Sequence, residues 1–136
     1  MFLDASVIVV NLLEEPEATA FRLILAQSSG NVTSPLAMFE ASTRIAAVRR
    51  VSIETAYEIV RDFTEEAAIK VVAIDAAVGA AAHACAARYH HMTGHAARLN
   101  MGDCFAYASA RTSGLKLAYK GNDFVHTDID GVRFGA

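Results

Sequence analysis

The sequence predicts a single α/β domain over residues 1–136, with a central parallel sheet flanked by helices on both faces. Short apolar runs alternate with longer helical patterns from one end of the chain to the other, which is the order that builds a helix-covered parallel sheet. The length of 136 residues fits one domain. Hydrophobic residues make up 54% of the chain and charged residues only 20%, so a disordered chain is excluded.

In the first half of the chain, short strands alternate with helices that begin at recognisable signals. Ser34 and Ser52 are typical helix N-caps, and Pro35 suits the first helical position. Pro16 suits the first turn of a helix that carries Phe21. The expected elements in order are a strand at Met1–Leu3, a helix to Leu13, a helix from Pro16, a strand at Val32–Thr33, a helix from Ser34 to about Arg50 and a helix after Ser52.

The second half of the chain continues this alternation. Ile69–Ile74 has the clearest strand pattern of the whole sequence. Asp75 then caps a long alanine-rich helix that runs to about His90, and its small side chains allow close packing against neighbours. The remaining expected elements are a helix at Gly102–Ser113, a strand at Leu115–Tyr119, a turn at Gly121–Asp123 and a short strand at Val132–Phe134.

Patterns typical of membrane and secreted proteins do not occur. The longest apolar run, Val7–Leu13, is broken by Asn11 and is well short of the ~18 residues that a membrane span needs. The start Met1–Asp4 lacks the basic region of a signal peptide. Two cysteines, Cys85 and Cys104, are too few for a disulfide framework. We therefore expect a reduced, cytoplasmic domain with no membrane partner.

Four acidic residues fall where the predicted sheet would bring their side chains toward one edge. Ligands of open parallel sheets gather outside the carboxyl ends of the strands. Asp4 directly follows the first expected strand, and Asp123 follows the fourth after a glycine turn. Glu40 lies beside the core-facing stripe of the helix that follows the second strand. Asp103 lies in the first turn of its helix, where the helix dipole favours a carboxylate.

Clustered carboxylates repel one another, so they stay ionised together only when a cation lies among them. Mg²⁺ and Mn²⁺ prefer oxygen ligands, and one or two such ions can activate water for phosphodiester cleavage. Singly, each acid has an ordinary structural interpretation. Asp4 suits a helix cap, Asp103 a dipole-favoured first turn, and Glu40 an exposed helix face; Asp123 suits a turn. Their combination is more specific than any one of them and predicts a metal site.

The acids lie in four segments: Phe2–Ser6 (FLDAS), Leu36–Ala41 (LAMFEA), Leu99–Ala108 (LNMGDCFAYA) and Lys120–Phe124 (KGNDF). In this order, and over the whole chain, they resemble the PIN-domain ribonucleases, and within them most closely the VapC toxins of bacterial toxin–antitoxin pairs. The first and third segments are quite specific, whereas the glutamate segment is weak alone. The resemblance implies a single PIN-like domain over residues 1–136.

The resemblance also implies an activity and the residues that perform it. The implied activity is that of a Mg²⁺-dependent endoribonuclease, a hydrolase of RNA phosphodiester bonds, with Mn²⁺ as a substitute metal. Asp4 and Asp103 match the principal metal-binding aspartates of this catalytic site. Glu40 matches the second acid of the quartet and Asp123 the fourth. Ser6 matches a small hydroxyl residue that supports the first aspartate.

Partners follow from the same resemblance. It implies a homodimer that is inhibited by a VapB-like antitoxin, and an RNA target such as transfer RNA or a ribosomal RNA loop. Asp128 also has an acidic counterpart in many relatives, so the position of the fourth acid stays open between Asp123 and Asp128. The number of metal ions also stays open.

Two alternative functions fit part of the pattern. A receiver-like phosphoacceptor domain has a similar length and a late lysine such as Lys120, but it needs an acceptor aspartate after a middle strand, and none follows Val32–Thr33. A catalytically inactive PIN fold would act only as a binding module, and the intact quartet of acids argues against it. The candidates for contacts with RNA phosphates are Arg44, Arg49, Arg50, Arg111, Lys116 and Lys120.

Overall fold

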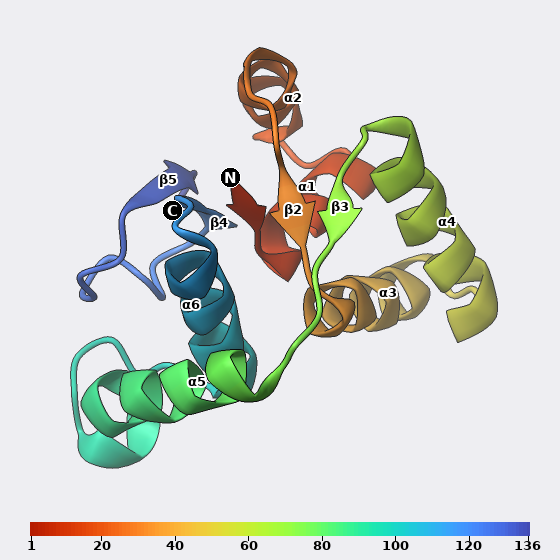
Figure 1. The fold of residues 1–136 in the computed structure, drawn as a ribbon. Coiled ribbons are helices and arrows are strands. Elements are labelled where there is room, and N and C mark those ends of the chain that lie inside the picture. The colour runs from red at the N-terminus through yellow and green to blue at the C-terminus, as the bar shows by residue number, and fades with distance from the viewer.

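The computed structural model describes all 136 residues and contains one five-stranded sheet with every neighbouring pair parallel (Figure 1). The strand order is β3-β2-β1-β4-β5. In chain order the strands are β1 (Phe2–Leu3), β2 (Val32–Thr33), β3 (Lys70–Val71), β4 (Leu117–Lys120) and β5 (Gly131–Phe134). The two-residue strand β1 at the N-terminus is the central one, because Phe2 pairs with both Val32 and Leu117.

Helices cover both faces of the sheet, as predicted. They are α1 (Ala5–Leu12), α2 (Ala18–Gln27), α3 (Pro35–Arg49), α4 (Ile53–Glu66), α5 (Ala76–Tyr89) and α6 (Met101–Ser113), with a short 3₁₀ turn at His91–Thr93. No helix is both long enough and apolar enough to cross a membrane.

The alternation of side chains along the central strands creates two hydrophobic cores. Phe2 and Leu3 are both fully buried, and adjacent residues of a strand point to opposite faces of the sheet. Leu3 packs with Ile8 and other residues of α1 to α4, whereas Phe2 packs with Leu99, Leu117 and residues of α5 and α6. Figure 1 shows α5 and α6 together on one side of the sheet, away from α3 and α4.

The predicted helix caps are confirmed. Ser34 and Ser52 accept hydrogen bonds from backbone N–H groups in the first turns of α3 and α4, and Asp75 does the same for α5. Such caps satisfy N–H groups that have no partner within the helix. Pro16 lies before α2 rather than inside its first turn, because the helix begins at Ala18.

Two predicted strands differ from the structure. Only Lys70–Val71 of the Ile69–Ile74 run forms a strand, and both residues are exposed, because β3 is an edge strand that pairs with β2 alone. The fourth strand begins at Leu117 rather than Leu115. The N–H of Leu115 still bonds to the carbonyl of Ala110 at 3.0 Å, so this residue completes the end of α6.

Candidate active site

Asp4 lies where β1 ends and α1 begins, and it is the N-cap of that helix. Its Oδ2 accepts hydrogen bonds from the backbone N–H of Ser6 at 3.1 Å and from the Ser6 hydroxyl at 2.5 Å. The Ser6 hydroxyl in turn accepts a hydrogen bond from the backbone N–H of Lys120 at 3.0 Å. Ser6 therefore ties the carboxylate of Asp4 to the carboxyl end of β4, and the other oxygen of Asp4 accepts no side-chain hydrogen bond.

Asp103 is fixed by a reciprocal pair of hydrogen bonds at the start of α6. Its Oδ2 accepts the backbone N–H of Asn100 at 3.0 Å, and its own N–H donates to Oδ1 of Asn100 at 2.9 Å. This is a capping box, which satisfies two backbone donors at once. The sequence pattern Asn-Met-Gly-Asp contains this signal, but our prediction left Asn100 in the preceding loop.

Glu40 lies on α3 with its carboxylate against the start of α6. A Cβ atom on Gly102 would lie 2.5 Å from Oε1 of Glu40, closer than real Cβ contacts allow. Gly102 thus leaves the space that the carboxylate occupies. Since Asp103 is the next residue, this close approach brings Glu40 to the same turn of α6.

Asp4, Glu40 and Asp103 influence one another electrostatically, and each has a raised pKa. Burial, together with the negative charges of Asp123, Asp4 and Glu40, raises the pKa of Asp103 to about 7, although the hydrogen bond from Asn100 opposes this shift. Burial raises the pKa of Glu40 to about 7 as well, with a contribution from Asp4. The pKa of Asp4 is raised mainly by burial, with Asp123 adding repulsion. We call these four residues the acid cluster; they come from four separate parts of the chain.

The acid cluster offers the oxygen donors that hard divalent cations prefer, and mutual repulsion favours a cation among them. No three of its carboxylates stand close enough together to form a closed set of metal ligands. Mg²⁺ usually binds through one or two carboxylates and keeps several waters, so this open arrangement suits it. The donor set therefore fits a hydrated divalent ion.

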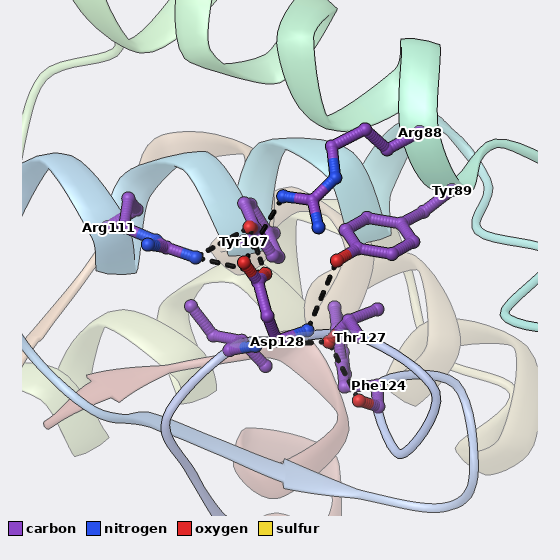
Figure 2. Close-up of polar contacts among 8 residues, drawn as sticks. Arg88, Tyr89, Tyr107, Arg111, Phe124, Thr127 and Asp128 are labelled. Carbon is purple, nitrogen blue, oxygen red and sulfur yellow. Dashed lines mark hydrogen bonds and ion pairs between the residues drawn. The ribbon is translucent and has the colours of Figure 1, made fainter.

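Asp128 lies outside the acid cluster, in a network with two arginines and two tyrosines (Figure 2). Its Oδ1 accepts hydrogen bonds from Tyr107 Oη at 2.5 Å and lies 3.0 Å from Nη2 of Arg111. Its Oδ2 lies 3.1 Å from Nη1 of Arg88, and its backbone N–H donates to the hydroxyl of Tyr89 at 3.3 Å. The Tyr107 hydroxyl and the guanidinium groups hold the pKa of Asp128 well below its ordinary value. Of the two candidates for the fourth acid, only Asp123 acts on the acid cluster.

Some of the side chains that we proposed for phosphate contacts already make hydrogen bonds or ion pairs within the protein, and others make none. Arg111 is paired with Asp128, and Arg49 donates to the carbonyl of Leu12 at 2.8 Å. Lys120 pairs with Glu15 at 2.5 Å and with Glu17 at 3.1 Å. The remaining candidates, which make no hydrogen bond or ion pair through their side chains, are Arg44, Arg50 and Lys116.

Comparison with known proteins identifies the family. The family model described as the PIN domain matches residues 1–130. A VapC ribonuclease of Rhizobium meliloti is 41% identical over 139 residues, covering 94% of this chain and 98% of its own length. The chain belongs to the VapC ribonuclease branch of the PIN-domain family. Ribonuclease VapC30 of Mycobacterium tuberculosis is 36% identical, with 95% of each protein covered.

Two solved structures share the fold of this chain. VapC20 of Mycobacterium tuberculosis, a sarcin–ricin loop cleaving toxin, superposes with a TM-score of 0.72 at 16% identity and covers 96% of this chain and 97% of its own. A toxin–antitoxin complex from Klebsiella pneumoniae gives a TM-score of 0.62 at 16% identity, covering 91% and 89%. These similarities confirm the predicted fold.

Membership of the VapC branch confirms the predicted activity class. The protein is a ribonuclease of the toxin type, and VapC ribonucleases with a PIN domain depend on metal ions. The receiver-like interpretation is thereby excluded, since that fold and chemistry belong to another family.

Proposed function

We propose that this chain is the toxin of a VapBC-type pair and that it cleaves RNA at the acid cluster with bound Mg²⁺. The observation that carries the proposal is that Asp4, Glu40, Asp103 and Asp123 influence one another electrostatically, with Glu40 against the turn of α6 that carries Asp103, and that no cationic side chain acts on them. The charges that shift the pKa values of Asp4, Glu40 and Asp103 are all those of other carboxylates. Such repulsion destabilises the empty cluster and favours the binding of a divalent ion.

The four acids have different roles in this proposal. Asp4 and Asp103 are the principal ligands, because hydrogen bonds fix one oxygen of each and leave the other oxygen for a cation. Glu40 and Asp123 accept no hydrogen bonds through their side chains and complete the coordination, directly or through water. Ser6 positions Asp4. When bound, Mg²⁺ (or Mn²⁺ in its place) supplies an activated water and neutralises charge on the cleaved phosphate.

The test is cleavage of a labelled total-RNA pool by the purified protein with Mg²⁺, with EDTA and with the variant Asp103→Asn. This variant keeps the size of the side chain but removes one negative charge. We expect discrete fragments that require Mg²⁺ and disappear in the variant. Asp62→Asn is the matched control, since this acid lies on α4 outside the cluster. Undiminished cleavage by Asp103→Asn would show that the metal site lies elsewhere.

The proposed inhibitor is a VapB-like antitoxin that acts in the cytoplasm. We propose that an arginine from its tail enters the acid cluster and competes with the metal ion through its charge. The uncompensated carboxylates support this idea, as does the similarity to a toxin–antitoxin complex. A structure of the complex in which the tail stays far from Asp4 and Asp103 would contradict it.

We also propose a homodimer. The apolar side chains of Val48 on α3 and Tyr57 on α4 are 52% and 46% exposed, and contiguous exposed apolar surface is typical of interaction sites. A groove of about 500 Å³ between the two helices includes Tyr57, Ile53 and Phe39. Light scattering of the purified chain should give twice the mass of 14.5 kDa.

The proposed RNA target is a loop of transfer or ribosomal RNA.

A further inference from the structure

A recess of about 290 Å³ lies between the C-terminal half of α5 and the first turns of α6. Its α5 side consists of Ala82, His83 and Ala86 on the helix and His90, the C-cap that follows it. Positions 83, 86 and 90 have the i, i+3, i+7 spacing that places residues on one face of a helix. The two alanines are too short to fill the space against α6, so the sequence of α5 itself creates the hollow between the two histidines.

The opposite wall comes from the turn of α6 that also carries the catalytic acid. Met101, Cys104 and Phe105 line the recess, and they flank Gly102 and Asp103 in the sequence. The recess and the acid cluster therefore lie on different sides of one helical turn. An α-helix with its side chains is about 10 Å wide. Stacked nucleotides rise by about 3.4 Å each, so a strand of about three nucleotides spans that width.

The two histidines give the recess one hydrogen-bond acceptor and one donor. Nδ1 of His83 lies 2.8 Å from the carbonyl of Gly79, so the neutral ring donates there and leaves Nε2 as an acceptor. Nδ1 of His90 accepts the N–H of Met92 at 3.2 Å, so its proton is on Nε2, which is a donor. Neither Nε2 makes a hydrogen bond within the protein.

We propose that this recess binds an unpaired base of the RNA substrate close to the cleaved bond. The inference rests on cleavage at the acid cluster, as proposed above. Unpaired bases are recognised by stacking on flat or apolar side chains and by hydrogen bonds to their edges. The recess supplies both, with Phe105 and Met101 as apolar walls and the two imidazoles as edge partners.

Other ligands fit the recess less well. No arginine or lysine lines it, so a phosphate group has no charged partner there. The histidines have no third ligand with which to hold a metal ion. An apolar side chain of a protein partner would leave Nε2 of His83 and of His90 without hydrogen bonds. A base edge, which carries donors and acceptors side by side, satisfies both.

The experiment uses a short single-stranded RNA that contains the cut site found in the total-RNA assay. Abasic nucleotides replace the natural ones singly, on either side of the cut. For the wild-type protein, we expect one abasic position to lower kcat/KM about tenfold. For His90→Ala, kcat/KM on the intact RNA falls by a similar factor, and the same abasic substitution then has little further effect. The Mg²⁺ concentration at half-maximal rate stays unchanged.

Matched controls separate recognition from folding. His126→Ala and Met92→Ala replace residues of the same types outside the recess, and both should leave the abasic profile of the wild type intact. His90→Asn keeps a donor near the same place and should restore part of the activity. Met101→Ala should reduce stacking and lower kcat/KM less than His90→Ala does.

The outcomes distinguish this inference from the proposed function. If the wild type cleaves RNA but no abasic position near the cut matters, the recess binds no base. The same conclusion follows if every abasic RNA affects His90→Ala as strongly as the wild type. Absence of any cleavage that depends on Mg²⁺ and Asp103 overturns the proposed function, and the inference with it. The effect of each abasic position is measured on the wild-type protein, so this test does not depend on whether any variant folds.

Discussion

Helix α6 carries two groups of charged residues that are built in opposite ways. At its start, Asp103 joins three other carboxylates with no cation among them, and the pKa of Asp103 rises to about 7. About one and two turns later, Tyr107 and Arg111 hold Asp128, whose pKa falls because the partners of this carboxylate are hydrogen-bond donors and cations. One helix thus presents an uncompensated group of acids and a compensated one.

The contrast shows how the role of a carboxylate follows from its neighbours. An acid whose charge is balanced by hydrogen-bond donors and cations of the protein stabilises the fold. The network around Asp128 joins α5, α6 and the loop between β4 and β5, so it fixes three elements together (Figure 2). An uncompensated cluster costs stability and persists where a ligand needs it. Asp123 and Asp128, only five residues apart, fall on opposite sides of this division.

The sharpest test of the contrast compares Asp4→Asn with Asp128→Asn. We expect Asp4→Asn to reduce the rate of RNA cleavage at least about a hundredfold, because it removes the negative charge of a proposed principal metal ligand. Asp128→Asn should keep the rate within about threefold but lower the melting temperature by about 3 °C, since it weakens a half-exposed network. Cleavage kinetics and thermal melts on the same samples measure both effects. A large loss of cleavage in Asp128→Asn, without loss of structure, would erase the division between the two groups.

A smaller effect is expected from Gly102→Ala. The added Cβ would displace the carboxylate of Glu40, which is the flexible end of a side chain, so the fold should tolerate the change. The displaced acid should weaken Mg²⁺ binding by about tenfold, as loss of a supporting contact at a metal site typically does. The Mg²⁺ dependence of cleavage measures the effect. Gly79→Ala on α5 is the control, since a Cβ there meets no atom. Equal Mg²⁺ dependence of cleavage in the two variants would argue against a role for Glu40 in binding the metal ion.

The smallest expected effect is on how stability depends on pH, and it has opposite signs for the acid cluster and for Asp128. Folding raises the pKa of Glu40 and of Asp103 to about 7, so their contribution to stability is present below about pH 4 and is lost as the pH rises through about 7. In EDTA, the melting temperature should therefore fall by a few degrees from about pH 5 to about pH 8. Mg²⁺ should raise it more at the higher pH. A fall of the same size in the variant Asp103→Asn would show that other groups cause the change.

Asp128 contributes with the opposite sign. Because its pKa is lowered in the folded protein, its stabilising contribution is present above its ordinary pKa near 4 and is lost as the pH falls further. The same melts extended below pH 4 should show this loss in the wild type and not in Asp128→Asn.

Local sequence patterns predicted the starts of the helices well, because adjacent residues determine where a helix is capped. The caps at Ser34, Ser52 and Asp75 lie where their hydroxyl or carboxylate groups can satisfy the first turn of a helix, and this depends only on adjacent residues. The predicted length of β3 was wrong, since Val72 to Ile74 have a strand pattern but their neighbour β2 ends at Thr33 and offers them no partner. Strand pairing depends on distant parts of the chain, and a single segment does not contain that information.

The sequence could nominate residues for the candidate site but could not predict their contacts. Asp4, Glu40 and Asp103 could be chosen from their positions after strands and at helix starts. The partners of Asp128 could not, because Arg88 lies 40 residues away in the sequence and meets it only in the folded protein. The same holds for the approach of Glu40 to Gly102 and for the recess between α5 and α6, which are products of tertiary packing.

The different anchoring of the four acids has a consequence for the size of ion that the proposed metal site would accept. Asp4 and Asp103 are held by hydrogen bonds at the ends of β1 and at the start of α6, whereas Glu40 and Asp123 have side chains without such bonds. Metal–oxygen distances are about 2.1 Å for Mg²⁺ and about 2.4 Å for Ca²⁺. Two fixed and two movable carboxylates can contract or expand to match either radius. Affinity alone will therefore separate these ions poorly, and selection between them must come from how well each one activates water.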